Sequence, residues 1–188
     1  MKKKARIDQV VTKTGDQGFT HIIGGAEVSK ASLRVDTYGN VDEVNSLLGV
    51  IISFMQKEQE NEKNTLISIQ NDLFIAGADL ASPSEFNVPR INETHINRID
   101  DSIAQYQQHL SPLQDFILPG GTTIASLLHL ARTVVRRTER SIVRFSETEK
   151  INPHLLVYFN RLSDFLFILA RFSNKKGCAE EIYCNFEK

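Results

Sequence analysis

The chain has 188 residues, of which 41% are hydrophobic and 24% are charged, and its formal net charge is −1. These values are ordinary for one soluble globular domain with a substantial core. The near-zero charge argues against a nucleic-acid-binding protein, which normally carries a strong basic excess.

The N-terminus and the cysteines indicate the compartment. The lysine-rich segment 1–6 is not followed by an apolar h-region, and no apolar run is long enough to span a membrane. Cys178 and Cys184 have neither the spacing nor the companion ligands of a disulfide framework or a structural zinc site. We therefore expect a cytoplasmic protein with reduced cysteines and no membrane partner.

The N-terminal segment 10–23 does not have helical periodicity. Two short β-type runs flank the turn Gly15-Asp16-Gln17-Gly18, which predicts a hairpin. A longer loop containing two glycines, Lys30 and Arg34 follows.

From about Asn40 onward the apolar residues recur with a helical period. The pattern predicts five helices, over about 40–55, 64–80, 92–110, 122–145 and 153–176. Thr122 or Thr123 caps the fourth helix, Asn152 caps the fifth with Pro153 in its first position, and Gly177 ends it. The predicted fold is all-α: a five-helix bundle over 37–177, with a short hairpin-like arm over 1–36 and a tail over 178–188, in a single domain spanning 1–188.

Three of these helices carry a polar stripe opposite their apolar side. The stripe of the fourth helix lies within an arc of about 100° and that of the first is made of small residues. The stripes are Arg132, Arg136, Glu139 and Arg140 on the fourth helix, Asn160, Asp164 and Arg171 on the fifth, and Asp42, Asn45, Ser46, Gly49 and Ser53 on the first.

These stripes have two interpretations. They are solvated faces, as on most surface helices, or they meet another molecule. Small residues allow close approach, and three arginines within two turns repel one another unless an anion or an acidic partner such as Asp42 neutralises them. The helical pattern alone leaves both interpretations open.

The loop over 12–20 contains three threonines, two glycines and Lys13. Such a loop can turn backbone N–H groups toward phosphate oxygens, and Asp16 could hold Mg²⁺ directly or through water. It is not a Walker A loop, and taken alone it is equally an ordinary hairpin turn. Together with the arginines it favours an anion site, in which a triphosphate would be matched by Lys13, Lys30, Arg34, Arg136, Arg137 and Arg140.

The sequence does not contain the motifs that other catalytic or metal sites require. The five histidines form no HExxH motif or nucleophile pair, and His129 is predicted to be a packed helix residue. A ferritin-like centre would need Glu-x-x-His ligands, and Glu139 has no such partner.

Five sequence blocks, in order, resemble the PduO-type corrinoid adenosyltransferases. The resemblance extends from about residue 9 to 172, with Thr138 where the family usually has Ala and Phe159 where Leu is common. The blocks are 12–18, 38–46, 116–121, 131–140 and 159–167.

The resemblance implies an enzyme that transfers the 5′-deoxyadenosyl group of ATP to the cobalt of cob(I)alamin, releasing triphosphate and forming adenosylcobalamin. It implies four catalytic residues: Arg136 acts on the triphosphate, Phe116 lies under the corrin ring, and Asp42 pairs with Arg132 across a subunit interface. The arm then becomes a nucleotide-binding arm, and the implied ATP-binding residues are Thr12, Lys13, Thr14, Gly15, Asp16, Gly18, Thr20, Lys30, Arg136, Arg137, Glu139, Arg140 and Asn160.

The resemblance also implies the ligands and partners. These are ATP, Mg²⁺, cob(I)alamin or cob(II)alamin, and two further copies of the chain in a homotrimer with interfacial active sites. A flavoprotein reductase and a B12-dependent acceptor enzyme could also be partners. The alternative is a nucleotide-binding bundle without corrinoid chemistry, and retention of Asp42, Arg132, Phe116 and Asn160 favours the enzyme.

Overall fold

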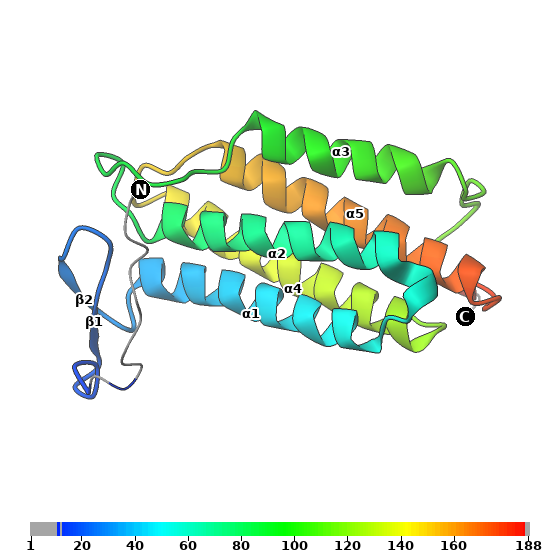
Figure 1. Ribbon diagram of the computed structural model, residues 1–188, viewed down its shortest axis with the longest axis horizontal. Coiled ribbons are helices and arrows are strands. Elements are labelled where there is room, and N and C mark those ends of the chain that lie inside the picture. The colour runs from blue at the N-terminus through cyan, green and yellow to red at the C-terminus, as the bar shows by residue number, and fades with distance from the viewer. Residues whose placement is uncertain (1–10, 12, 187–188) are drawn as a thin grey trace.

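The computed structural model describes residues 11 and 13–186, and over these residues it confirms a five-helix bundle with a short two-stranded hairpin (Figure 1). The elements are β1 (Phe19–His21), β2 (Glu27–Ser29), α1 (Leu33–Phe54), the 3₁₀ turn η1 (Lys57–Gln59), α2 (Glu60–Leu80), α3 (Glu93–Gln107), α4 (Thr123–Ser146) and α5 (His154–Lys176).

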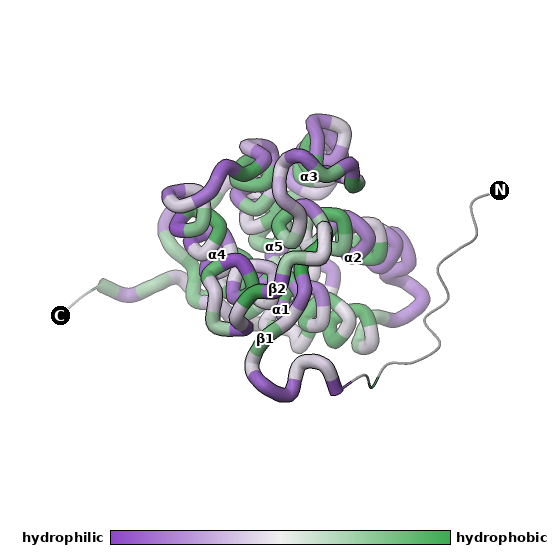
Figure 2. Tube along the Cα trace, turned by 90° about the vertical axis from the view of Figure 1, so that its left-hand side faces the viewer, coloured by the Kyte–Doolittle hydropathy of each residue, from purple (hydrophilic) through white to green (hydrophobic). Residues whose placement is uncertain are grey.

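The core lies where α4 packs against α1 and α5, with α2 covering α1 and α3 covering α5. Figure 2, which looks along the bundle, shows the helices grouped around this centre. Phe159 and Thr138, the two departures from the family pattern, are both fully buried. The Thr138 hydroxyl lies 3.0 Å from the Val134 carbonyl oxygen and 3.2 Å from that of Asn40, so burying it leaves no unpaired donor.

Two helices begin earlier than predicted. α1 starts at Leu33, about two turns before Asn40, after Ser32, whose hydroxyl accepts from the Val35 N–H. The prediction was wrong because the loop was extended past Arg34 to about Asn40, although a helix interior tolerates one glycine, here Gly39, at a cost of about 1 kcal/mol. Residues 33–36 therefore belong to the bundle. α2 starts at Glu60 rather than Asn64, directly after η1.

The later helix ends agree more closely with the sequence. The Thr122 hydroxyl accepts from the Ala125 N–H at 3.2 Å, as predicted for the cap of α4. At the start of α5 the cap position is Pro153, one residue later than predicted, although the Asn152 side chain still accepts from the His154 N–H at 3.1 Å. Gly177 ends α5 as predicted.

The hairpin is displaced from its predicted position. β1 pairs antiparallel with β2, with Thr20 opposite Val28, and the connection contains Gly24 and Gly25 at φ 104° and 86°. The predicted first run, 10–14, is not a strand where it is described, and residues 10 and 12 lie outside the described part. Two consecutive glycines accept the positive φ values that a tight turn needs, so the turn forms there.

The two ends of the bundle carry different features. The arm lies where α1 begins and α4 ends, whereas the α3–α4 connection and the C-terminal segment lie at the opposite end (Figure 1). The Ile23 N–H donates to the Ala81 carbonyl at 3.2 Å, which ties the arm to the end of α2. None of the described helices is long and apolar enough to cross a membrane.

Candidate active site

A cavity of about 630 Å³ opens between the α3–α4 connection, α4 and α5. Phe116 projects from the connection with 74% of its surface exposed. Three of the four residues predicted to be catalytic line this one cavity, and its walls are Leu113, Gln114, Asp115, Phe116, Ile117, Arg132, Arg136, Ser163, Asp164 and Phe167.

Arg132 lines this cavity, and one nitrogen of its guanidinium is buried without a partner in the described part of the chain. Its guanidinium lies over the Phe167 ring, 5.9 Å from the centroid. Its Nε is buried and has no hydrogen-bond partner among the described residues. Burial, and then repulsion from Arg136, lower the pKa of Arg132. Such a cation would be stabilised by an added anion or carboxylate.

Arg136 is one turn further along α4 and is exposed to the cavity. Its backbone carbonyl accepts from Arg140 Nη1 at 3.1 Å. Within the described part of the chain its own side chain has no hydrogen bond or ion pair. Arg132 and Arg136 therefore bring two positive charges without an ion-pair partner among the described residues to a cavity that Asp115 and Asp164 also line.

The other members of the predicted arginine cluster have partners within the chain. Arg137 forms a close ion pair with Glu43, and both side chains are about half exposed at 48% and 52%. The Asn160 amide donates to Glu139 Oε1 at 3.3 Å. Arg137 thereby links α4 to α1, and Glu139 links α4 to α5.

Asp42 does not join this cavity. It is exposed and lines a separate groove of about 310 Å³ between α1 and α2, beside Tyr38, Phe74 and Gly77. Asp42 and Arg132 form no ion pair within the single chain. The predicted pairing therefore needs a second copy and stays a prediction.

Two polar stripes contain residues that face inward, contrary to the sequence interpretation. Asn45 is 6% exposed, and it exchanges hydrogen bonds with Gln70 of α2 at 3.0 and 3.3 Å. Arg171 is 7% exposed and pairs with Glu181, so it does not share a surface with Asn160. Helical periodicity could not anticipate either contact, because each partner comes from a distant segment.

The arm is closed by Lys30. Its Nζ donates to the Gly15 carbonyl at 2.7 Å and its N–H to the Gly18 carbonyl at 2.8 Å. Lys13 and Gly18 adopt positive φ values of 58° and 83°, as a tight loop requires. Thr14 and Asp16 are exposed, Thr20 lies in β1, and Thr12 lies outside the described residues.

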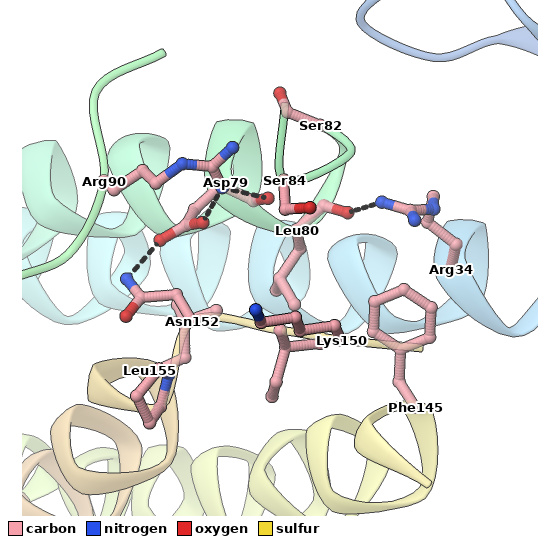
Figure 3. Close-up of a pocket in the computed structure, with 12 residues that line it drawn as sticks. Arg34, Asp79, Leu80, Ser82, Ser84, Arg90, Phe145, Lys150, Asn152 and Leu155 are labelled. Carbon is pink, nitrogen blue, oxygen red and sulfur yellow. Dashed lines mark hydrogen bonds and ion pairs between the residues drawn. The ribbon is translucent and has the colours of Figure 1, made fainter. Parts of the chain in front are cut away.

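Arg34 is not available as a phosphate ligand (Figure 3). Its Nη1 donates to the Leu80 carbonyl at 2.7 Å, its Nη2 pairs closely with Glu149, and its guanidinium lies 4.9 Å from the centroid of Phe145. With only 11% of its side chain exposed, Arg34 braces the start of α1 against the end of α4.

Arg34 belongs to a pocket of about 280 Å³ at the arm end of the bundle, which Figure 3 shows. The carboxylate of Asp79, which lines this pocket, is buried and has several partners. It pairs closely with Arg90 and accepts from the Ile91 N–H at 3.2 Å and from the Asn152 amide at 2.7 Å. These contacts join α2 to the segments before α3 and α5, so the polar groups there serve the fold.

Sequence reasoning missed two features of the Phe116 cavity. Phe167 was assigned no role, yet a signal existed, because Phe167 follows Asn160 and Asp164 at helical spacing on one face of α5. The C-terminal segment was also given no role, although it contacts the Phe116 connection. His129 is 2% exposed, with its ring 5.8 Å from that of Phe167, which confirms it as a packed residue.

Comparisons with known proteins identify the family of this chain. A family model described as cobalamin adenosyltransferase matches residues 10–173. A corrinoid adenosyltransferase from Bacillus subtilis is 41% identical over 171 residues, which cover 90% of this chain and 88% of that protein. A cobalamin adenosyltransferase from Cupriavidus metallidurans is 37% identical over 183 residues and 97% of each chain.

Solved structures give the same result. A variant of the PduO-type ATP:corrinoid adenosyltransferase from Lactobacillus reuteri, complexed with cobalamin and ATP, superposes with a TM-score of 0.91 at 38% identity, covering 96% of this chain and 98% of that one. Another variant of that enzyme, complexed with ATP, gives a TM-score of 0.89. A family match over most of the chain, relatives near 40% identity and a shared fold lead to one conclusion: this chain belongs to the cobalamin adenosyltransferase family.

Proposed function

We propose that the protein transfers the 5′-deoxyadenosyl group of ATP to the cobalt of cob(I)alamin, with the Phe116 cavity as its corrinoid site. The observation that carries the site assignment is the meeting of Phe116, Arg132 and Arg136 on one cavity large enough to admit part of a ligand. The relative from Lactobacillus reuteri, which binds cobalamin and ATP, supports the ligand assignment.

For this reaction the protein must position two reactants, ATP and cob(I)alamin. The cob(I)alamin cobalt attacks the ribose 5′-carbon, a Co–C bond forms, and the C–O bond breaks with its electron pair leaving on triphosphate. The nucleophile needs no general base, so aligning the reactants and stabilising the leaving group supply the catalysis. Arg136, exposed and unpaired within the described chain, is placed to bind the developing charge.

Phe116 supplies an apolar surface for the lower face of the corrin. A phenyl ring there would occupy the space of the lower axial ligand and exclude water from the cobalt. Cobalt without that ligand is easier to reduce from Co(II) to Co(I). The connection that carries Phe116 is exposed, which leaves the ring accessible to a ligand as large as a corrinoid.

Mg²⁺ fits this site as an ion carried by the nucleotide. Among the described residues no three His, Cys, Asp or Glu side chains cluster as a metal site, and Asp16 is a single exposed carboxylate in the arm. Phosphate oxygens would supply most ligands, with Asp16 adding one directly or through water. When bound, the ion would neutralise charge on the leaving triphosphate.

We further propose that each site is shared between copies of the chain in a homotrimer. The arm and the Phe116 connection lie at opposite ends of one bundle (Figure 1), and Asp42 lines a different groove from Arg132. A neighbouring copy could bring Asp42 to Arg132 and an arm to Arg136. The buried, unpaired Nε of Arg132 supports this, since an incoming carboxylate would satisfy it.

The direct test is spectroscopic. Chemically reduced cob(I)alamin and Mg-ATP are mixed with the protein without oxygen, and the visible spectrum is followed for the alkylcobalt product. Product formation is expected. A protein that binds ATP and leaves the cob(I)alamin spectrum unchanged would instead be a nucleotide-binding bundle without corrinoid chemistry.

The Phe116→Ala variant tests the corrinoid assignment in the same assay. We expect nearly normal ATP affinity and near-normal turnover of pre-reduced cob(I)alamin, but roughly 100-fold slower adenosylation when the reaction starts from cob(II)alamin and a reductant. Equal rates for variant and parent from cob(II)alamin would remove Phe116 from the corrinoid site.

A further inference from the structure

The segment after α5 forms a short ladder with the connection that carries Phe116. The Cys184 N–H donates to the Phe116 carbonyl at 2.8 Å, and the Leu118 N–H donates to the Ile182 carbonyl at 2.8 Å. Between them, Ile117 and Tyr183 pair as an antiparallel bridge. This segment lies beyond residue 173, where the match to the family model ends.

Arg171 joins the two partners of this ladder. Its Nε and Nη2 donate to the two carboxylate oxygens of Glu181 at 2.8 and 3.0 Å, and Nη2 also donates to the Ser111 carbonyl at 3.0 Å. Ser111 lies at the beginning of the α3–α4 connection, and Glu181 directly precedes the ladder. One guanidinium therefore holds the connection and the segment that pairs with it.

The ion pair is well placed to act as a clamp. The side chains of Arg171 and Glu181 are only 8% and 20% exposed, so water screens their attraction less than at the surface. The bidentate geometry fixes direction as well as distance. By contrast, Phe116 is 74% exposed, and its ring meets that of Phe186 edge-on with the centroids 6.4 Å apart, so packing of the ring fixes the connection less firmly than a buried ion pair does.

We propose that the Arg171–Glu181 ion pair is the positioning element for Phe116: it clamps the C-terminal segment to the α3–α4 connection and so sets where the phenyl ring lies under the corrin. This rests on the function proposed above for Phe116. Arg171 acts through the ladder and does not touch substrate. Because the ladder has few hydrogen bonds, loss of the clamp frees the connection.

The first test measures the connection itself. Glu181→Gln keeps the size of the side chain and removes the charge, and it lies outside the helices, so the bundle should fold. We expect faster amide hydrogen exchange at Leu118 and Cys184. The matched control is Lys176→Gln, which removes the 2.9 Å ion pair with Glu62 from the same helix without touching the ladder. Parent-like exchange in Glu181→Gln, or equal acceleration in the control, would overturn the clamp.

The second test measures the consequence for cobalt. With Mg-ATP and cob(II)alamin, the electron paramagnetic resonance spectrum distinguishes cobalt with and without its lower ligand. Glu181→Gln should lose most of the form without that ligand and slow adenosylation from cob(II)alamin by roughly ten- to a hundredfold, with ATP affinity unchanged. Faster amide exchange with a parent-like cobalt spectrum would overturn the positioning role.

Phe116→Ala, measured in parallel, separates this proposal from the one on which it rests. If Phe116→Ala itself keeps the parent cobalt spectrum, the role of Phe116 is wrong, while amide exchange still decides whether the ion pair holds the connection. If Phe116→Ala loses the signal and Glu181→Gln keeps it, Phe116 is positioned by something other than the clamp.

Discussion

At the scale of single residues, the site contains two arginines that have no ion-pair partner among the described residues. Arg132 has a buried Nε without a partner, and Arg136 faces the same cavity. Maintaining two neighbouring cations costs stability, and a bound triphosphate or carboxylate would offset that cost. Arg137, which was also predicted to match the triphosphate, is paired with Glu43 instead, so the sequence alone does not separate ligand-binding arginines from structural ones.

Replacing Arg136 tests the phosphate assignment. We expect Arg136→Ala to lower kcat/KM for ATP by on the order of 100- to 1000-fold, because it removes charge stabilisation from the leaving group. Arg144→Ala is the control, since Arg144 is exposed on the same helix and does not line the cavity. Steady-state kinetics with cob(I)alamin measure both. Nearly normal kcat/KM in Arg136→Ala would refute the assignment.

His129 predicts a pH dependence of stability. Both of its ring nitrogens are buried without a hydrogen-bond partner among the described residues. Burial, and then the charge of Arg132, lower the pKa of His129 from its ordinary 6.5, while Glu181 opposes this shift. The folded state therefore favours neutral imidazole. Its contribution to stability is complete above the unfolded pKa and is lost as pH falls from there toward the folded pKa.

We therefore expect His129→Leu to change stability by less than about 1.5 kcal/mol near neutral pH. The two side chains have similar size, and the substitution removes no hydrogen bond, because neither ring nitrogen of His129 makes one among the described residues. Below the ordinary histidine pKa, the free energy of unfolding should fall less in the variant than in the parent. Urea denaturation at about pH 7.5 and about pH 5.5 measures the difference. Parallel losses in the two proteins would contradict the inferred burial of neutral imidazole.

At the scale of elements, helix periods and caps were predicted well and helix starts less well. α3 begins near its predicted start, and α4 and α5 begin within about one residue of their predicted caps, because Asn92, Thr122 and Asn152 accept backbone N–H groups there. The start of α1 was predicted about two turns too late. Gly39 lowers the helix propensity of this segment, and the helix forms through it nevertheless. The hairpin was misplaced because strand pairing depends on a partner that local sequence does not specify.

The turn before α4 gives an element-scale prediction. Gly121 has φ 107°, and a Cβ there would lie 2.1 Å from Asn174 Oδ1, the atom that accepts from the Thr122 N–H at 2.9 Å. We expect Gly121→Ala to destabilise the protein by about 1–3 kcal/mol or more. Gly120→Ala is the matched control, because a Cβ there meets no heavy atom within 4 Å, and it should change stability by less than about 1 kcal/mol. Thermal and urea denaturation compare the two, and equal effects would contradict the strain at Gly121.

At the scale of the whole molecule, the bundle separates the components of the proposed site. The arm and the Phe116 connection lie at opposite ends, and Asp42 and Arg132 line different cavities. In the homotrimer proposed above, a heterologous ring contact would bring these residues together, because each copy would donate an arm to one neighbour and receive one from the other.

Mixed assemblies test this sharing. Lys30→Ala and Arg136→Ala should each be nearly inactive alone. When equal amounts are unfolded together and reassembled, roughly a quarter of the sites should contain both native groups, so activity should recover to about that fraction. Mixing without subunit exchange is the control and should give no recovery. A reassembled mixture as inactive as its parents would place each complete site within one chain.

The sequence by itself determined the five helices, their apolar faces, most of their caps and the grouping of Arg132, Arg136, Glu139 and Arg140, because these follow from local periodicity and backbone hydrogen bonding. Only the tertiary structure decided which polar residues remain free. Asn45 and Arg171 were predicted to lie on polar stripes, and they bond to Gln70 and Glu181 instead. Arg34 was predicted to match a triphosphate, and it pairs with Glu149. A side chain's partner is set by which distant segments pack beside it, and helical period carries no information about that.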